Sequence, residues 1–197
     1  MTEKDTLPLI RTKLHRPPVA ADHLHRQHLL ERLEKNVNRP LTLVSAPAGY
    51  GKTTLMSCWL ESCDFLSAWV SLDKNDNDLR MFLAYFLAAV QSIFPDAARE
   101  TRAMLNAPEL PSLRVLALSL INELDRIEKN FILVLDDYHV IHAKAVQDLI
   151  IELLKNPPGP MHLVLVTRRD PSMPLTTHRA RSLMTEIRIQ DLRFSAE

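Results

Sequence analysis

The sequence predicts an α/β fold in which helices cover both faces of a mostly parallel, five-stranded sheet. Three observations support this prediction. Short apolar runs typical of strands alternate along the chain with patterns typical of helices. Two of these runs are apolar almost throughout, as in strands that are buried on both faces of a parallel sheet. A glycine-containing loop joins the first strand to a helix, which is the connection found at the ligand-binding edge of such sheets.

This loop lies between a strand predicted at Leu41 to Ser45 and a helix predicted from Thr53 to Leu60. Only 3 glycines occur in the 197 residues, and two of them, Gly49 and Gly51, lie here. The run Ala46-x-x-x-x-Gly51-Lys52-Thr53 has the spacing of a P-loop, with alanine in the first position where the usual pattern has glycine. The predicted fold is therefore a P-loop NTPase three-layer sandwich with an extended N-terminal lead-in.

The residue types in this loop suit phosphate binding. Glycine tolerates positive φ values, so successive N–H groups can point inward at an anion, next to the positive end of the following helix. We expect Lys52 to reach the β- and γ-phosphates and the Thr53 hydroxyl to ligate Mg²⁺, whereas an ordinary glycine turn would need neither side chain. The expected nucleotide-binding residues are Ala46, Pro47, Ala48, Gly49, Tyr50, Gly51, Lys52, Thr53 and Thr54.

The remaining elements follow in order. Residues 1–22 contain prolines and little periodicity, which predicts an extended lead-in, and a helix capped by Asp22 is predicted to end before Pro40. The elements expected after the loop helix are a strand at 67–72, a polar turn at 73–78 that caps a helix through residue 90, a loop at 95–111 with some helix near 98–105, a helix at 112–128, an apolar strand from residue 131 that ends in two carboxylates, a helix at 143–155, a strand at 161–167 and an edge strand at 187–189.

Three of the predicted strands end in residues suited to nucleotide chemistry, and ligands of parallel sheets bind at those ends. Lys52 and Thr53 follow the first strand, Asp136 and Asp137 end the third, and Arg168 follows the fourth. Asp136 is expected to hold Mg²⁺ opposite Thr53, and Asp137 to orient or deprotonate an attacking water. Arg168 is expected to sense the γ-phosphate, because a guanidinium matches phosphate oxygens. A solvated strand end or a helix cap is the alternative for the two carboxylates.

Other polar residues are interpreted as structural. His139 and His142 follow the acidic pair and suit the entry of a helix. Four arginines between residues 179 and 193 form a basic tail without interleaved aromatic residues. This composition favours a solvated or domain-docking face over a nucleic-acid patch.

The overall composition limits the partners and the compartment. Lys plus Arg and Asp plus Glu each number 24, so the formal net charge is zero and no overall field attracts nucleic acid or acidic membrane. Cys58 and Cys63 suit neither a metal cluster nor a disulfide framework, which indicates reduced thiols. The N-terminus lacks the pattern of a signal peptide, and no apolar run approaches the ~20 residues of a membrane span. We therefore expect a cytoplasmic protein with no direct nucleic-acid or membrane binding by this chain.

Five motifs of the sequence together resemble a known family. The motifs are Ala46-Pro-Ala-Gly-Tyr-Gly-Lys-Thr-Thr54, Ala68-Trp-Val-Ser-Leu-Asp73, Leu133-Val-Leu-Asp-Asp-Tyr138, Leu163-Val-Leu-Val-Thr-Arg168 and Asp191-Leu-Arg-Phe194. Together they resemble the nucleotide-binding domain of the large ATP-dependent bacterial transcription regulators of the maltose-activator (MalT, LuxR-type) group. That group belongs to the STAND class of signal-transduction ATPases with numerous domains.

The resemblance implies a switch between ADP-bound and ATP-bound states, with self-association in the ATP state and hydrolysis as the reset. It implies that Asp136 is the Walker B aspartate, that Asp137 is its acidic neighbour and that Arg168 is a sensor arginine. It also implies that the lead-in, around Val19 and Arg26, lines the adenine pocket.

Members of the group continue into further domains that include a DNA-binding helix-turn-helix, which is not evident in this sequence. We therefore expect a lead-in and helix at residues 1–40, a P-loop core at 41–190 and the start of a linker at 191–197. The expected function is a weak, regulatory ATPase that uses ATP, ADP and Mg²⁺ and contacts either the missing C-terminal domains or a second copy. Two alternatives stay open: a small kinase-like enzyme and a nucleotide-binding scaffold without turnover.

Overall fold

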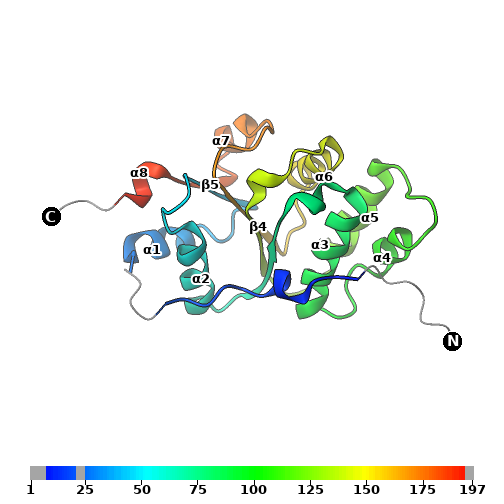
Figure 1. Ribbon diagram of the computed structural model, residues 1–197, viewed down its shortest axis with the longest axis horizontal. Helices are drawn as coiled ribbons and strands as arrows, with labels where there is room; N and C mark the ends of the chain where they lie inside the picture. Colours follow the sequence, from blue (N-terminus) through cyan, green and yellow to red (C-terminus); the bar gives the residue numbers. More distant parts are fainter. Residues whose placement is uncertain (1–7, 21–24, 194–197) are drawn as a thin grey trace.

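A computed structural model describes residues 8–20 and 25–193 (Figure 1). Its centre is one sheet in the order β2-β3-β4-β1-β5, and all neighbouring strands are parallel. The strands are β1 (Leu41–Ser45), β2 (Leu66–Ser71), β3 (Phe131–Asp136), β4 (Met161–Thr167) and β5 (Met184–Arg188). The predicted five-stranded sheet is confirmed, and the last strand lies at an edge as expected.

Helices cover both faces of this sheet, so the fold has three layers. On one face lie α1 (Gln27–Lys35) and α2 (Lys52–Ser62), and on the other lie α3 (Leu79–Ile93), α4 (Arg99–Leu105), α5 (Leu113–Asp125) and α6 (Lys144–Lys155), as Figure 1 shows. Two short helices, α7 (Thr176–Ala180) and α8 (Ile189–Leu192), flank β5 in the chain. None of the helices within the described ranges is long and apolar enough to cross a membrane.

The alternation of side chains along the strands divides the core into two halves. Val44, Val134 and Val164 belong to the cluster under α1 and α2, whereas Leu43 and Leu133 belong to the cluster under α3 to α6. Because the side chains of a strand alternate between its faces, Asp136 continues the side of Val134. The end of β3 is therefore directed toward α2, the helix that follows the P-loop.

The lead-in crosses the β2 side of the molecule. It contains a short 3₁₀ turn, η1 (Arg11–Leu14), where the sequence predicts extended chain. The ammonium of Lys13 lies 2.5 Å from the buried carboxylate of Asp76 and 4.1 Å from the centre of the Tyr85 ring. The predicted helix cap Asp22 and the motif residue Phe194 lie outside the described residues.

Several element boundaries differ from the prediction. The edge strand begins at Met184 rather than at residue 187, because it pairs with β1 along the whole of that strand, from Leu41 opposite Met184 to Ser45 opposite Arg188. The polar residues at 185 and 186 interrupt the apolar pattern there and conceal the start of the strand. Helix α7 is not predicted, since its five residues Thr-Thr-His-Arg-Ala have no buried member.

Candidate nucleotide-binding site

The P-loop, residues 46–53, has a backbone open to a ligand. Gly49 and Gly51 have φ values of 84° and 71°, which only glycine adopts readily. A Cβ added at Gly49 would meet nothing within 4 Å. Gly51 is the N-cap of α2 and provides no side-chain hydrogen bond to the first turn of the helix. The first amides of α2 therefore have no capping side chain, which is the arrangement found in anion sites at helix N-termini.

Lys52 starts α2 and lies across the loop. Its side chain is largely buried, and its Nζ donates a hydrogen bond to the Pro47 carbonyl at 2.8 Å. Burial lowers the pKa of Lys52, the charge of Asp136 opposes this shift, and the charge of Arg168 adds to it. The ammonium is thus held inside the loop, near both the carboxylate of β3 and the arginine that follows β4.

Thr53 and Asp136 meet at the ends of the P-loop and β3. The Thr53 hydroxyl donates to Asp136 Oδ2 at 3.0 Å, and the Asp137 amide donates to Asp136 Oδ1 at 2.9 Å. Burial raises the pKa of Asp136, which is only 5% exposed. A hydroxyl and a carboxylate are hard oxygen donors of the kind Mg²⁺ takes beside phosphate oxygens. The oxygens of Thr53 and Asp136 therefore fit a magnesium ion. That these two residues bind magnesium stays a prediction.

Asp137 and Arg168 form a more exposed group next to that pair. Asp137 has a positive φ of 55°, and its Oδ1 lies 3.6 Å from His139 Nδ1 and 3.9 Å from Arg168 Nε. Burial lowers the pKa of His139, and the charge of Asp137 opposes that shift. The sequence interpretation preferred a helix-entry role for His139 over a contact with a nucleotide, and the structure places its ring beside Asp137 in this group. The close spacing of the two residues in an Asp-Tyr-His turn is the signal that would have found it.

Arg26 lies beside the loop from the α1 side. A Cβ added at Gly51 would lie 3.9 Å from an Arg26 guanidinium nitrogen, and burial lowers the pKa of Arg26. The proximity of Arg26 to the P-loop is therefore a property of the fold. Its contribution to an adenine pocket, with Val19, remains a prediction.

Asp170 is the polar residue that the sequence interpretation missed. It lies two positions after Arg168. Its carboxylate accepts a hydrogen bond from the Ser45 hydroxyl at 2.8 Å and forms an ion pair with Arg188. Ser45 and Arg188 are opposite each other in the register of β1 and β5. Nothing in the linear pattern relates these three positions, because the contact depends on that register.

The predicted nucleotide-binding residues differ in exposure. Ala46 and Lys52 are buried, Tyr50 and Thr53 are half-buried, and the others are exposed: Pro47, Ala48, Gly49, Gly51 and Thr54. Tyr50 packs against the apolar cluster under α1 and α2. The exposed stretch is thus the middle of the loop, and its two ends are anchored in the core.

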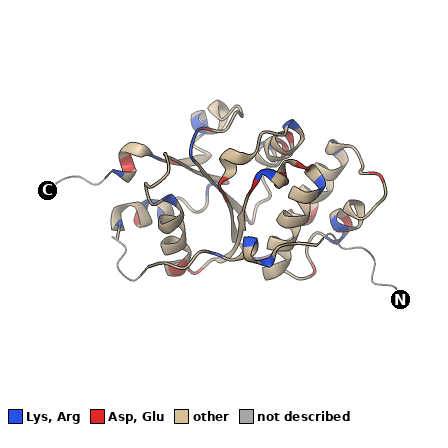
Figure 2. Ribbon diagram, in the orientation of Figure 1, with Lys and Arg blue, Asp and Glu red and all other residues tan. Residues whose placement is uncertain are grey.

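The basic tail is partly neutralised by acidic neighbours. Arg179 forms ion pairs with Glu186 and Asp170, and Arg188 pairs with the same two carboxylates. Acidic and basic residues are interspersed along the ribbon (Figure 2). These ion pairs agree with a docking or solvated face. They engage Arg179 and Arg188 with carboxylates, whereas a surface that binds phosphodiester backbones presents its basic side chains to the ligand.

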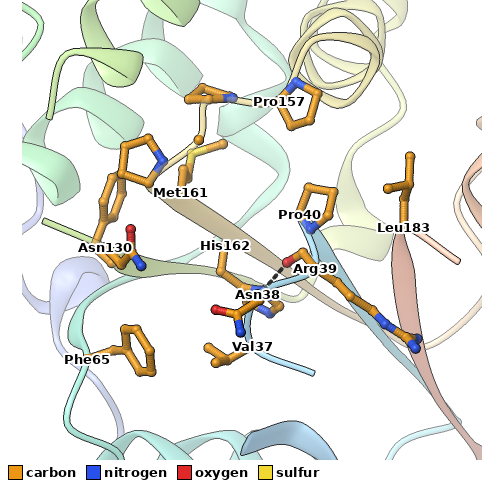
Figure 3. A pocket seen from close by; sticks show the side chains of 14 residues that line it. Val37, Asn38, Arg39, Pro40, Phe65, Asn130, Pro157, Met161, His162 and Leu183 are labelled. Atoms are coloured by element: carbon orange, nitrogen blue, oxygen red, sulfur yellow. Dashed lines mark hydrogen bonds between the residues drawn. The ribbon is translucent and has the colours of Figure 1, made fainter. Parts of the chain in front are cut away.

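A separate cavity of about 250 Å³ lies at the opposite edge of the sheet (Figure 3). It is lined by residues that precede or start strands, among them Pro40, Phe131, Met161 and Leu183. Ligands of parallel sheets bind at the carboxyl ends of strands, so this position does not match a nucleotide site. The side chain of His162 borders it and is fixed by a hydrogen bond from its Nδ1 to the Arg39 carbonyl, drawn as a dashed line in Figure 3.

Comparison with curated proteins gives matches along nearly the whole chain. The sequence is 35% identical over 187 residues to the HTH-type transcriptional regulator MalT of Klebsiella pneumoniae subsp. pneumoniae, and 33% identical to MalT of Yersinia pestis. Each match covers 95% of this chain and 21% of the regulator. The chain therefore spans about a fifth of the length of these relatives. No protein-family model matches it.

Two solved structures have a similar fold. The Walker-type ATPase PABY2304 of Pyrococcus abyssi superposes with a TM-score of 0.52 at 14% identity, over 86% of this chain and 55% of that one. Cdc6p of Pyrobaculum aerophilum superposes with a TM-score of 0.51 at 18% identity, over 91% and 49%. The chain therefore has a fold similar to that of this Walker-type ATPase, and its sequence is similar to about a fifth of the HTH-type transcriptional regulator MalT.

Proposed function

We propose that this chain is the nucleotide-switch domain of a signal-responsive bacterial transcription regulator, which binds ATP or ADP with Mg²⁺ and hydrolyses ATP slowly. The observation that carries the proposal is the 3.0 Å hydrogen bond between Thr53 and Asp136. It joins Thr53, which follows the P-loop lysine, to the buried carboxylate at the end of β3. In the sheet, β3 lies two strands away from β1, the strand that leads into the P-loop. A glycine turn without a ligand needs no such pair, whereas magnesium-dependent nucleotide binding does.

The residues divide into those that bind the phosphates and those that act on the γ-phosphate. The loop amides and Lys52 would bind the phosphates, and Thr53 with Asp136 would hold Mg²⁺, which would neutralise charge on the phosphate oxygens. Asp137 is about half exposed and accepts a proton from an attacking water. Arg168 contributes positive charge to the terminal phosphate.

Slow hydrolysis follows from the exposure of the acting groups. The Arg168 side chain is 53% exposed and the Asp137 side chain 48%, so water and salt screen both charges. Contacts from a second copy or from neighbouring domains would exclude water there and raise the rate. Self-association, DNA binding by other parts of such a regulator, and a cytoplasmic location belong to this proposal.

The test is calorimetry of the purified chain with Mg-ATP and with Mg-ADP, together with steady-state turnover. We expect binding of both nucleotides, loss of at least about tenfold in affinity in Lys52→Ala, equivalent to about 1.4 kcal/mol, and turnover below about 1 per second. Lys144→Ala is the matched control, because that lysine forms an exposed ion pair on α6. Absence of nucleotide binding in the wild-type chain would rule the proposal out.

The same measurements separate the two alternatives. Tight binding of nucleotide without any turnover would favour a scaffold. Phosphorylated product on a candidate acceptor, in place of inorganic phosphate, would favour a kinase-like enzyme.

A further inference from the structure

Asp170 connects three segments that are far apart in the sequence. Its Oδ1 accepts a hydrogen bond from Ser45 Oγ at 2.8 Å and an ion pair from Arg188 Nη1, and its Oδ2 lies 3.9 Å from Arg179 Nη2. Ser45 is the last residue of β1 and leads into the P-loop, and Arg188 is the last residue of β5. The carboxylate therefore fastens the chain after β4 to the entry of the phosphate-binding loop.

This contact joins the Asp170 carboxylate, whose side chain is 52% exposed, to a hydroxyl and a guanidinium that are better shielded from water. Ser45 is buried, and the Arg188 side chain is 22% exposed and also bonded to Glu186 at 2.7 and 2.9 Å. Burial alone would raise the pKa of Asp170, but the hydrogen bonds from Arg188 and Ser45 outweigh it and lower that pKa. Asp170 is thus an anion at neutral pH, held by a donor on β1 and a cation on β5.

The short segment 168–170 is fixed on both sides of Arg168. Before it, the Thr167 hydroxyl donates to the Arg169 carbonyl at 2.6 Å. After it, Asp170 is bonded to Ser45. The pairing of Thr167 with Ser45 across β4 and β1 already places Arg168 beside the entry of the P-loop. The two side-chain contacts then restrain the backbone of residues 168–170 at that place.

A groove of about 540 Å³ lies along this segment, and both Arg168 and the P-loop residues Ala46 and Pro47 line it together with Asp170. Arg168 is also close enough to the loop for its charge to act on Lys52. The distance between Arg168 and the phosphate-binding loop is accordingly the quantity that the Asp170 contact controls.

We propose that Asp170 is a positioning residue that holds Arg168 at the distance from the P-loop at which it distinguishes a nucleoside triphosphate from a diphosphate. The inference rests on the proposed nucleotide-switch function and adds to it the residue that sets the discrimination. Asp170 touches no phosphate in this scheme and acts only through the segment 168–170 and Ser45.

The test measures the affinities of the full chain for Mg-ADP and for the non-hydrolysable analogue Mg-AMPPNP, and reports their ratio. We expect Asp170→Ala to lower the preference for the triphosphate by at least about fivefold, within the range typical of coupling between sites, while affinity for ADP changes less than about twofold. Arg168→Ala should lower the ratio similarly. The double variant should show no further loss, because the two residues act through one interaction.

Two further variants make the result independent of folding defects. Asp170→Asn keeps an acceptor for Ser45 and loses the ion pair, so its ratio should be intermediate. Ser45→Ala removes only the hydrogen bond and should also lower the ratio. Asp148→Ala, which removes a partly exposed carboxylate paired with Lys144 on α6, is the control and should leave the ratio unchanged.

Three results would contradict the inference or the function on which it rests. An unchanged ratio in Asp170→Ala, or equal losses for both nucleotides, would reduce Asp170 to a structural contact of the loop. Full additivity with Arg168→Ala would show that the two residues act separately. Failure of the wild-type chain to bind either nucleotide would instead remove the proposed function beneath it, which is a distinguishable result.

Discussion

At the scale of single residues, the buried carboxylate of Asp136 lowers the stability of the folded chain while it suits a metal-binding role. Its carboxylate is 5% exposed, and its bonds to Thr53 and to the Asp137 amide do not prevent burial from raising its pKa. A charged group whose pKa is raised by burial destabilises the folded chain at neutral pH. Such local instability at a site is expected where the charge serves a ligand.

We predict that Asp136→Asn stabilises the nucleotide-free chain, by about 1 kcal/mol, and abolishes magnesium-dependent ATP binding. The asparagine oxygen can accept from the Asp137 amide while its NH2 donates to the Thr53 hydroxyl, so both hydrogen bonds can form without the buried charge. Thermal melts with and without Mg-ATP measure both effects. Asp137→Asn is the control, since that residue is half exposed and asparagine tolerates its positive φ; it should not raise the melting temperature. A lower melting temperature for Asp136→Asn would contradict the prediction.

The sequence predicted the central pair of the site but not the residues around it. Thr53 and Asp136 are each adjacent to a strong local signal, a P-loop and an apolar strand, and strand-end geometry brings such residues together. His139 has only its close spacing to Asp137 as a signal, and Asp170 has none. Their contacts depend on a left-handed turn at Asp137 and on the register of β5 against β1, which are properties of the folded chain.

At the scale of elements, the lead-in is attached by a buried ion pair. Lys13 Nζ lies 2.5 Å from Asp76 Oδ2, and Asp76 is completely buried. The same oxygen of Asp76 accepts a hydrogen bond from the Asp73 amide at 2.7 Å, and the Ile10 amide donates to the Tyr85 hydroxyl at 3.0 Å. These contacts hold the lead-in against the segment that precedes α3.

We predict that Lys13→Met lowers the free energy of unfolding by about 3 kcal/mol, because it leaves the Asp76 carboxylate buried without its cation. Lys144→Met breaks an ion pair in which the lysine side chain is 85% exposed and should cost less than about 1 kcal/mol. Urea unfolding of the two variants measures the difference. Equal effects of the two substitutions would show that the lead-in contributes little to stability.

Element prediction succeeded where apolar periodicity was strong and failed where packing was decided by distant residues. β1 and β4 have the predicted strand limits because their apolar runs are continuous and fully buried. β3 begins as predicted but ends at Asp136, before the second carboxylate, because Asp137 adopts a positive φ. The 3₁₀ turn of the lead-in depends instead on the contacts of Lys13 with α3 and its preceding turn. Such tertiary contacts override local preference, so a single sequence does not indicate them.

At the scale of the whole molecule, the sheet separates two edges with different roles. The carboxyl edge collects the P-loop, Asp136 and Arg168, whereas the amino edge carries the cavity beside His162. His162 lies under Trp59, with ring centroids 5.7 Å apart, and its Nε2 accepts from the Thr42 hydroxyl at 3.0 Å. Because its Nδ1 donates to the Arg39 carbonyl, the neutral ring satisfies both of its nitrogens.

The buried His162 makes the stability of the whole fold depend on pH. Burial lowers the pKa of His162 from 6.5 to about 4, so between these values the unfolded chain binds one more proton than the folded chain does. The contribution of His162 to the free energy of unfolding is therefore fully present above about pH 6.5. It decreases as the pH drops and is lower by about 3 kcal/mol at pH 4 and below.

We predict that His162→Gln reduces the pH dependence of the free energy of unfolding. Measured in urea between pH 4.5 and 6, its slope against pH should fall by about 1.4 kcal/mol per pH unit. The lowered pKa values of Asp170 and Glu186 also make stability fall in acid, but chiefly below the ordinary pKa of a carboxylate, and both remain in the variant. An unchanged slope, or a ring of His162 that titrates near 6.5 by NMR, would show that this side chain is not buried as a neutral group.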